Sequence, residues 1–444
     1  MEASSAFQWP IWASASCVGL LVCLLSLHLI EKLVATQKLM QKATKSAGDE
    51  AFAHFQREYL LVYGLVMFAD WLQGTHMYSL YQSYGMNVGA LFLTGFLSSV
   101  VFGNFVGLLV DKYGRSKACL VYCALEIVIN LLENVPNMTV LLTGRVLGGI
   151  STSLLFSAFE SWLVTEHRAR GFPEELLGKT FALGSEINGV VAVIAGLAAQ
   201  IAADVLGDIG PFRAAVVVTA VAAVFVSSWS ENYGSSTVHK TASSDDSEAD
   251  TTGSLSMDAY ALGLCYSLFE GAMYVFVFLW YPTLEVVVPN RVLPSGLVFS
   301  SFMLCVAIGG KMFDLIDKSW LREELLLTAM VPASAVCLLI PTATENYQFI
   351  LGSFLVFEVC VGVILPCCAT LRSRHFPKVQ LSTTLSLFRL PTNVLVVLGT
   401  GGGSYWTSDQ LFYGCSVLLV VATGCALKLV QTSSTTPARK LKAQ

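Results

Sequence analysis

The sequence is poor in charged residues. Asp, Glu, Lys and Arg make up 13% of the 444 residues, whereas hydrophobic residues make up 55%, and the mean hydropathy is +0.65. Ordinary soluble domains carry about 25% charged residues. The composition therefore excludes such a domain and indicates an integral membrane protein. The net charge of −5 gives no support for nucleic-acid binding.

Metal-binding and catalytic patterns are also missing. The 12 cysteines lie mostly within apolar runs and show no CxxC or Cys/His spacing, so they indicate small core residues and not a disulfide framework. No Ser/His/Asp set or phosphate-cradling loop occurs in a polar connection. We therefore expect no enzyme activity, no cofactor and no metal. A secretory signal peptide is disfavoured, because Glu2 and no basic residue precedes the first apolar run.

Long apolar runs are what the sequence has instead, and each is long enough to cross a bilayer. Nearly all of the 26 Lys and Arg residues fall in alternate connections between these runs and in the C-terminal tail. Because basic connections stay in the cytosol, we expect the N-terminus outside and the C-terminus in the cytosol. The predicted spans are residues 9–31, 58–83, 86–110, 117–134, 138–164, 180–203, 211–229, 258–283, 295–316, 324–342, 346–371, 380–402 and 408–430.

An acidic segment containing SSDDSEAD separates the later spans into six and six. Its composition is typical of a flexible linker. The halves show weak internal likeness, since Gly103 corresponds to Gly309, and Gly149 to Gly362. Two parallel six-helix repeats are typical of one transporter architecture. The predicted organisation is an extra N-terminal helix and cytosolic connector at 1–57, a first half at 58–230, a cytosolic linker at 231–257, a second half at 258–430 and a cytosolic tail at 431–444.

The loop GNFVGLLVDKYGRSK at 103–117 resembles the loop signature of the major facilitator superfamily. Gly107, Asp111, Gly114 and Arg115 stand in the matching places, and a degenerate copy ends in Asp317-Lys318. Glycines permit close helix approach, and the charged residues can pair in one conformer and part in another. The loop is therefore expected to act in conformational change.

A second resemblance lies in the run GRVLGG at 144–149, which is similar to the fourth-helix signature of the superfamily, in which an arginine precedes spaced glycines. The resemblance implies that Arg145 contacts substrate or coupling groups. The span at 180–203 has spaced glycines but lacks the Gly-Pro pair of the antiporter signature, which disfavours an exchanger.

Longer strings resemble the molybdate-anion transporter branch of the superfamily. This likeness covers roughly residues 55 to 430 and implies an all-α, twelve-helix core that takes up molybdate across the cell membrane, with one extra N-terminal transmembrane helix in this chain. The strings are ADWLQ at 69–73, FSAFESW at 156–162, WSENY at 229–233, VFVFLW at 275–280, VFSSFM at 298–303 and LFRLPTN at 387–393.

Charged residues inside the spans mark candidate site residues, because charge is costly within a bilayer. A tetrahedral dianion needs cationic and hydrogen-bond donors when it leaves water, and an arginine fork supplies both. We expect one arginine from each half to hold it. Desolvation and like-charge repulsion favour protonated carboxylates, so proton symport is a hypothesis. The predicted substrate contacts are Arg145, Arg389, Gln73, Thr152 and Asn393, with Asp70, Glu160, Glu186, Glu270 and Glu358 for coupling or gating.

Helical spacing places positions 145, 149, 152, 156 and 160 on one face, which we expect to line the cavity. The alternative for these charges is a set of structural ion pairs that lock helices together. Two functional alternatives also stay open, a carrier for another anion such as sulfate and a non-transporting sensor on a carrier scaffold. The expected partners are the substrate oxyanion and the lipid bilayer, with no nucleic acid, and the expected oligomeric state is a monomer.

Overall fold

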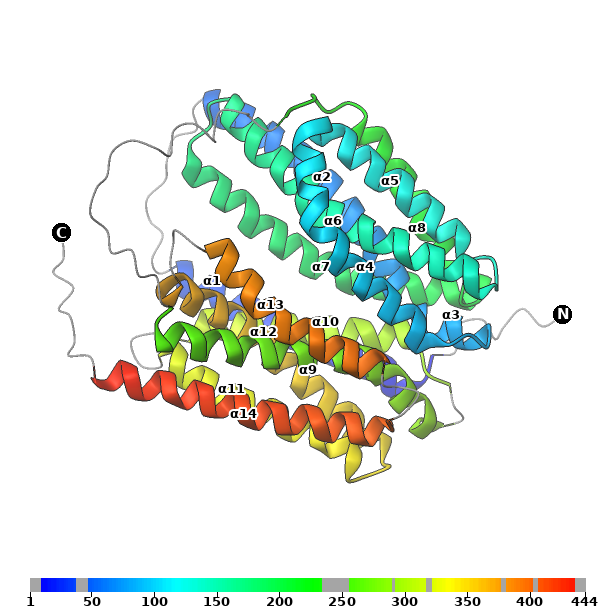
Figure 1. Cartoon of the computed structure of the whole chain (residues 1–444), viewed down its shortest axis with the longest axis vertical. Coiled ribbons are helices and arrows are strands. Elements are labelled where there is room, and N and C mark those ends of the chain that lie inside the picture. The colour runs from blue at the N-terminus through cyan, green and yellow to red at the C-terminus, as the bar shows by residue number, and fades with distance from the viewer. Residues whose placement is uncertain are drawn as a thin grey trace. The chain divides into compact units, whose positions relative to one another are not determined.

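The computed structural model describes residues 9–36, 47–233, 255–289, 292–316, 322–376, 381–401 and 406–435, and these residues are almost entirely helical, with no strand among them (Figure 1). The helices are α1 (Ile11–Thr36), α2 (Ala47–Gly74), α3 (Met77–Ser83), α4 (Val88–Tyr113), α5 (Arg115–Leu132), α6 (Met138–Ala169), α7 (Glu174–Leu206), α8 (Gly210–Val226), α9 (Met257–Val287), α10 (Ser295–Leu315), α11 (Glu323–Leu339), the short 3-10 helix η2 (Ile340–Thr342), α12 (Tyr347–His375), α13 (Leu381–Gly401) and α14 (Ser408–Thr435).

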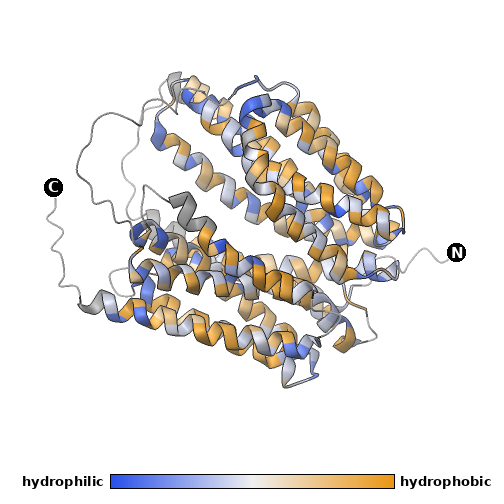
Figure 2. Ribbon diagram, viewed as in Figure 1, coloured by the Kyte–Doolittle hydropathy of each residue, from blue (hydrophilic) through white to orange (hydrophobic). Residues whose placement is uncertain are grey.

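Each apolar run expected to span the membrane coincides with one of these helices or a helix pair, and the all-α fold class is confirmed. Two runs are helix pairs: 58–83 is divided between α2, which ends at Gly74, and α3, which begins at Met77, and 324–342 is α11 followed by η2. By length and composition, eight of the described helices could cross a membrane, or up to nine if the two bent parts of α4 form one span. Figure 2 shows apolar residues along helices from both ends of the chain.

Short polar side chains begin several of these helices. Asn87, Asn137, Ser256 and Asn346 each precede a helix, and each accepts a hydrogen bond from a backbone N–H of the first turn. The first N–H groups of a helix have no partner within the helix, so such a side chain stabilises its start. These caps explain why the apolar runs become helices with well-defined starts.

Contacts divide the chain into two compact units. Unit 1 comprises residues 1–17, 35–248 and 294–303, and unit 2 comprises 18–34, 249–293 and 304–444. Within unit 1, α6 packs against α4 and α5, and α2 packs against α7 and α8; within unit 2, α9 packs against α12, α13 and α14, and α11 against α12 and α14. These boundaries differ from the expected halves, because α1 and α10 each have residues in both units and α2 begins at Ala47, inside the expected connector.

Close helix approach at glycine occurs at corresponding places in the two units. A Cβ on Gly149 of α6 would lie 2.4 Å from the backbone nitrogen of Ser99 in α4. A Cβ on Gly362 of α12 would lie 2.1 Å from the carbonyl oxygen of Val306 in α10. Real Cβ atoms essentially never approach another atom closer than 3.0 Å, so only glycine lets these backbones meet. The repeat correspondence inferred from the sequence thus has the same packing role in both units.

Candidate functional site

Arg145 lies in unit 1 and is held by an ion pair. Its Nη2 donates to Oε1 of Glu133 at 2.9 Å, and the same oxygen accepts a hydrogen bond from the Tyr81 hydroxyl at 2.8 Å. The Arg145 side chain is 11% exposed and that of Glu133 only 1%. Arg145 thus forms an ion pair, and its partner is Glu133, a residue absent from the predicted site.

The Arg145 guanidinium has few acceptors for its five N–H groups. Besides the Glu133 oxygen, its Nη1 contacts the sulfur of Met77 at 3.0 Å, and sulfur is a weak acceptor. Its Nε and the second Glu133 oxygen, Oε2, have no hydrogen-bond partner among the described residues. The Tyr81 ring lies 5.8 Å from the guanidinium carbon, within the range of a cation–π contact. The guanidinium can therefore accept a further oxygen ligand.

The Glu133 carboxylate is fixed by its position in the fold. The residue caps the C-terminus of α5, where its N–H donates to the carbonyl of Ile129. Its own carbonyl accepts the Tyr84 hydroxyl at 2.9 Å. Burial first, and then the negative charge of Glu133, raise the pKa of Tyr84, so this hydroxyl stays a donor. The backbone of Glu133 is thus anchored beside Arg145.

A second buried carboxylate, Glu126, lies seven residues earlier on α5. Its Oε1 accepts the Ser151 hydroxyl at 2.6 Å, and its Oε2 accepts the Gln73 amide at 2.8 Å and that of Asn130 at 3.4 Å. All three donors are neutral. Gln73, predicted to contact substrate, therefore has one amide N–H committed to Glu126. Two carboxylates, from one face of α5, share this interior with Arg145.

The predicted face of α6 is only partly continuous. Arg145 is mostly enclosed, and Gly149 is buried against α4. Thr152, Phe156 and Glu160 are exposed, and the Thr152 hydroxyl donates to its own helix at the carbonyl of Gly148. Close α4–α6 packing takes up this face at Gly149, and the expectation that the face lines the substrate cavity stays a prediction.

The remaining predicted residues of unit 1 are not brought to Arg145 by any contact in the described structure. Asp70 is partly buried near the end of α2, and it has neither an ion pair nor a hydrogen bond among the described residues. Glu186 of α7 is exposed. Their assignment to coupling stays a prediction.

In unit 2, Glu270 of α9 is the centre of a small polar cluster. It accepts the Tyr266 hydroxyl at 3.0 Å and the Thr392 hydroxyl at 3.2 Å. The Arg372 guanidinium stacks on the Tyr266 ring, with 4.1 Å between the guanidinium carbon and the ring centroid. Arg372 lies just beyond the predicted span 346–371, so the sequence does not point to this cluster.

Other predicted residues of unit 2 stand apart from this cluster. Glu358 of α12 is 5% exposed and has no hydrogen bond or ion pair within the described chain. On α13, Arg389 is exposed and Asn393 is half-buried, and neither shows a hydrogen bond to a described residue. The predicted joint grip by Arg145 and Arg389 stays a prediction, because the two residues belong to different units.

The loop between α4 and α5 is closed by the segment after α8. Gly114 has φ 110°, a backbone conformation that favours glycine. The Glu231 carboxylate accepts the N–H groups of Ser116 and Lys117 at 2.9 and 3.1 Å, which caps α5. The Arg115 N–H donates to the carbonyl of Asn232 at 3.0 Å. Glu231 and Asn232, at the start of the predicted linker, are thus hydrogen-bonded to the start of α5 within unit 1.

Side chains of the same loop also pair. The Arg115 guanidinium donates to Asp111 at 2.6 Å and to the hydroxyl of Thr165 on α6. Gly107 is half-buried in α4, and a Cβ there would meet nothing within 4 Å. The predicted second copy at Asp317-Lys318 lies outside the described residues. The pairing of Asp111 with Arg115 is the arrangement expected for one conformer of the loop.

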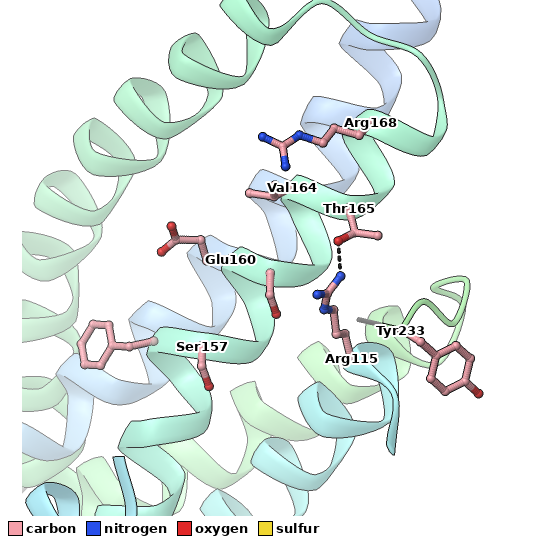
Figure 3. A pocket seen from close by; sticks show the side chains of 9 residues that line it. Arg115, Ser157, Glu160, Val164, Thr165, Arg168 and Tyr233 are labelled. Carbon is pink, nitrogen blue, oxygen red and sulfur yellow. Dashed lines mark hydrogen bonds between the residues drawn. The ribbon is translucent and has the colours of Figure 1, made fainter. Parts of the chain in front are cut away.

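A pocket of about 530 Å³ lies beside this end of α6. In Figure 3, Arg115 points toward Thr165, while Glu160 and Arg168 project from α6 on the side away from Arg115. The pocket is lined by Arg115, Phe156, Ser157, Glu160, Ser161, Val164, Thr165, Arg168 and Tyr233. The predicted gating residue Glu160 and loop residue Arg115 therefore border the same cavity.

Sequence reasoning missed Glu126, Glu133 and Glu231. Glu126 stands inside the apolar run 117–134, so the rule that flagged the other carboxylates could have found it. Glu133 stands at the end of that run, where a charge is ordinary, and only its contact with Arg145 marks it. Glu231 belongs to the string WSENY, which carried the branch resemblance without a physical reason.

The fold and its buried charges define a multi-pass membrane protein of the transporter class. The profile of a family described as sugar transporters with 12 transmembrane segments matches residues 25–364. The chain belongs to this family, which is part of the major facilitator superfamily.

Curated relatives extend over nearly the whole chain. The chain is 32% identical over 430 residues to a molybdate-anion transporter of Xenopus laevis, which covers 92% of this chain and 93% of the relative. It is 29% identical over 452 residues to a molybdate-anion transporter of Danio rerio, and this match covers 90% of this chain and 92% of the relative.

Solved structures share the fold at low identity. The nucleoside transporter NupG matches with a TM-score of 0.61 and 11% identity, over 85% of this chain and 99% of that one. The peptide transporter PepTSo matches with a TM-score of 0.65 and 10% identity, over 86% of this chain and 99% of that one. At these identities the likeness shows the fold alone.

Proposed function

We propose that this chain carries molybdate into the cell by alternating access. The observation that carries the proposal is the Arg145 guanidinium, which is nearly enclosed in unit 1 and yet has one oxygen acceptor among the described residues. A buried cation with free donors suits an oxyanion. The molybdate-anion transporters related to this chain over about nine-tenths of its length favour molybdate as that oxyanion.

We propose that one arginine from each sequence half contacts the substrate, and that smaller hydrogen-bond donors surround it. Arg145 supplies a fixed fork of N–H groups, and Arg389 supplies a second guanidinium. Gln73 has a second amide N–H beyond the one that Glu126 accepts. Thr152 and Asn393 complete the set.

Coupling is proposed to be proton symport through carboxylates of the interior, namely Asp70, Glu160, Glu186, Glu270 and Glu358. Asp70 and Glu358 support it best, because neither has a cationic partner among the described residues, and an unpaired carboxylate away from water favours its protonated form. The loop residues Gly107, Asp111, Gly114 and Arg115 would act in the exchange of conformers. Uptake that does not respond to external pH or to a protonophore would contradict the coupling.

The proposed setting is the cell membrane, with the N-terminus outside and the C-terminus in the cytosol. Support comes from the Lys and Arg residues, which lie nearly all on one side of the predicted topology. A monomer is proposed, since each half-repeat supplies site residues from the same chain. Epitope tags at each terminus, probed with and without permeabilisation, would check the orientation.

Uptake of radiolabelled molybdate by cells that express the chain tests the function. We expect saturable uptake above control cells, with sulfate as the competitor that measures selectivity. Arg145→Lys keeps the charge but loses the planar fork, so we expect its KM to rise about tenfold, which corresponds to about 1.4 kcal/mol. Arg213→Lys is the matched control, because Arg213 is exposed and its one hydrogen bond to a described side chain goes to Asn134. An unchanged KM in Arg145→Lys would contradict the proposed contact between Arg145 and substrate.

A further inference from the structure

Glu133 occupies the place on Arg145 that an incoming oxyanion would need. Its Oε1 lies 2.9 Å from Nη2 of Arg145, the distance of a charge-assisted hydrogen bond. No other carboxylate contacts this guanidinium among the described residues. A tetrahedral oxyanion seated on Arg145 would place its oxygens on the same donors. We propose that Glu133 is a tethered anion that substrate must displace from Arg145, and that it thereby sets the affinity for substrate; this rests on the proposed function.

The charge balance around Arg145 makes the two anions mutually exclusive. One guanidinium faces Glu133, and Glu126 lies two helical turns away on α5 with only neutral donors. A dianion that joined both carboxylates would leave one positive charge among several negative ones in an enclosed space. Like charges there repel strongly, because little water screens them. Substrate and Glu133 therefore compete for Arg145.

The geometry favours displacement over a permanent ion pair. The pair is monodentate, because only Oε1 of Glu133 accepts from Arg145, while Oε2 has no partner in the described chain. Nε of Arg145 likewise has none. Arginine–carboxylate pairs are frequently bidentate, as in Arg374, which donates to both oxygens of Glu323 at 3.0 and 2.9 Å. The monodentate pair leaves donors for a second ligand.

The different exposures of the Arg145 and Glu133 side chains also determine which of them substrate meets first. The Arg145 side chain is 11% exposed, against 1% for Glu133. An anion arriving from outside the unit therefore meets the arginine before the glutamate. The released Glu133 carboxylate keeps one donor, because the Tyr81 hydroxyl already binds the same oxygen at 2.8 Å. Tyr81 can thus hold Glu133 after it leaves Arg145.

Replacement of the charge tests the proposal. Glu133→Gln keeps the size and the acceptor for Tyr81 but removes the competing charge. We expect its KM for molybdate to fall about tenfold relative to wild type, since a charged hydrogen bond no longer has to be broken. Glu175→Gln is the matched control, because it makes the same change at an exposed position of α7 away from Arg145 and Gln73, and its KM should stay within about twofold. A purely structural role predicts less protein at the membrane with KM unchanged or higher.

A second variant covers a failure of Glu133→Gln to fold. Glu133→Asp keeps the charge but shortens the arm by one methylene, while Tyr84 and the end of α5 hold the backbone. The carboxylate then reaches Arg145 poorly, so KM should fall by a smaller factor. Surface expression is measured for every variant. An unchanged or raised KM in the folded variants would overturn the proposal.

Failure of this proposal can be told from failure of molybdate uptake. Saturable uptake by the wild type decides the function, and the ratio of KM values decides the role of Glu133. If the wild type takes up no molybdate, thermal-shift titration of the purified chain with molybdate and with sulfate replaces the KM values. Half-maximal stabilisation of Glu133→Gln at about a tenfold lower concentration would support the proposal. Equal concentrations, or no stabilisation of either protein, would overturn it.

Discussion

The close contact of α6 with α4 at Gly149 makes the sharpest prediction about the fold. In Gly149→Ala, the new methyl group would lie 2.4 Å from both the Ser98 hydroxyl oxygen and the Ser99 backbone nitrogen. Ordinary contact begins at 3.4 Å, so the two helices must separate by about 1 Å. Ser98 also donates to the carbonyl of Val146 at 2.7 Å, and this bond crosses the same interface.

Overpacking of this kind costs about 1 to 3 kcal/mol. We therefore expect the unfolding midpoint of the detergent-purified Gly149→Ala protein to fall by several degrees, as measured by fluorescence-detected size exclusion after heating. Transport should fall with it, because Arg145 lies one turn earlier on the same helix.

Gly148→Ala is the matched control for this experiment. A Cβ on Gly148 meets nothing within 4 Å, and alanine favours a helix over glycine by about 0.5 to 1 kcal/mol. We expect Gly148→Ala to leave the midpoint unchanged or to raise it slightly. Equal midpoints for the two variants would refute the account of α4–α6 packing.

Two further predictions concern carboxylates that hold helices in place. Glu231→Ala removes the acceptor of two N–H groups at the start of α5, so it should lower the unfolding free energy by about 1 to 2 kcal/mol. The control Glu175→Ala, at an exposed position, should leave the unfolding midpoint unchanged. Arg374→Gln takes two donors from Glu323, which is 6% exposed, and should lower the midpoint; Arg168→Gln breaks a pair exposed on both sides and should not. Equal effects of the two arginine variants would contradict the burial argument.

The sequence was a good guide to the helices because hydrophobic length and polar caps are local properties. Most apolar runs became single helices, and Asn87, Asn137, Ser256 and Asn346 mark helix starts directly. The break of the second predicted span near Thr75 was missed, although the sequence Gln-Gly-Thr-His at 73–76 interrupts the apolar run there. The family resemblance, carried by short motifs, is confirmed.

The candidate site was predicted less completely because it depends on contacts between helices. The cost of burying a charge pointed to Arg145, which is mostly enclosed, but its partner Glu133 depends on the turn between α5 and α6. Glu133 stands at the end of an apolar run, where sequence alone cannot tell a buried carboxylate from a solvated one. Gln73 was expected to face substrate, and the structure instead gives one of its donors to Glu126. The partner of a buried side chain depends on how helices pack together, and the hydrophobic pattern of a single sequence does not specify that packing.

Transport by the purified chain tests the central claim most directly. The protein is reconstituted into liposomes as the sole protein, and accumulation of radiolabelled molybdate is followed against its external concentration, with protein-free liposomes alongside. The account predicts saturable accumulation that falls when Arg145 is replaced by lysine. Accumulation no greater than in protein-free liposomes, across the range of concentrations and pH, would contradict it.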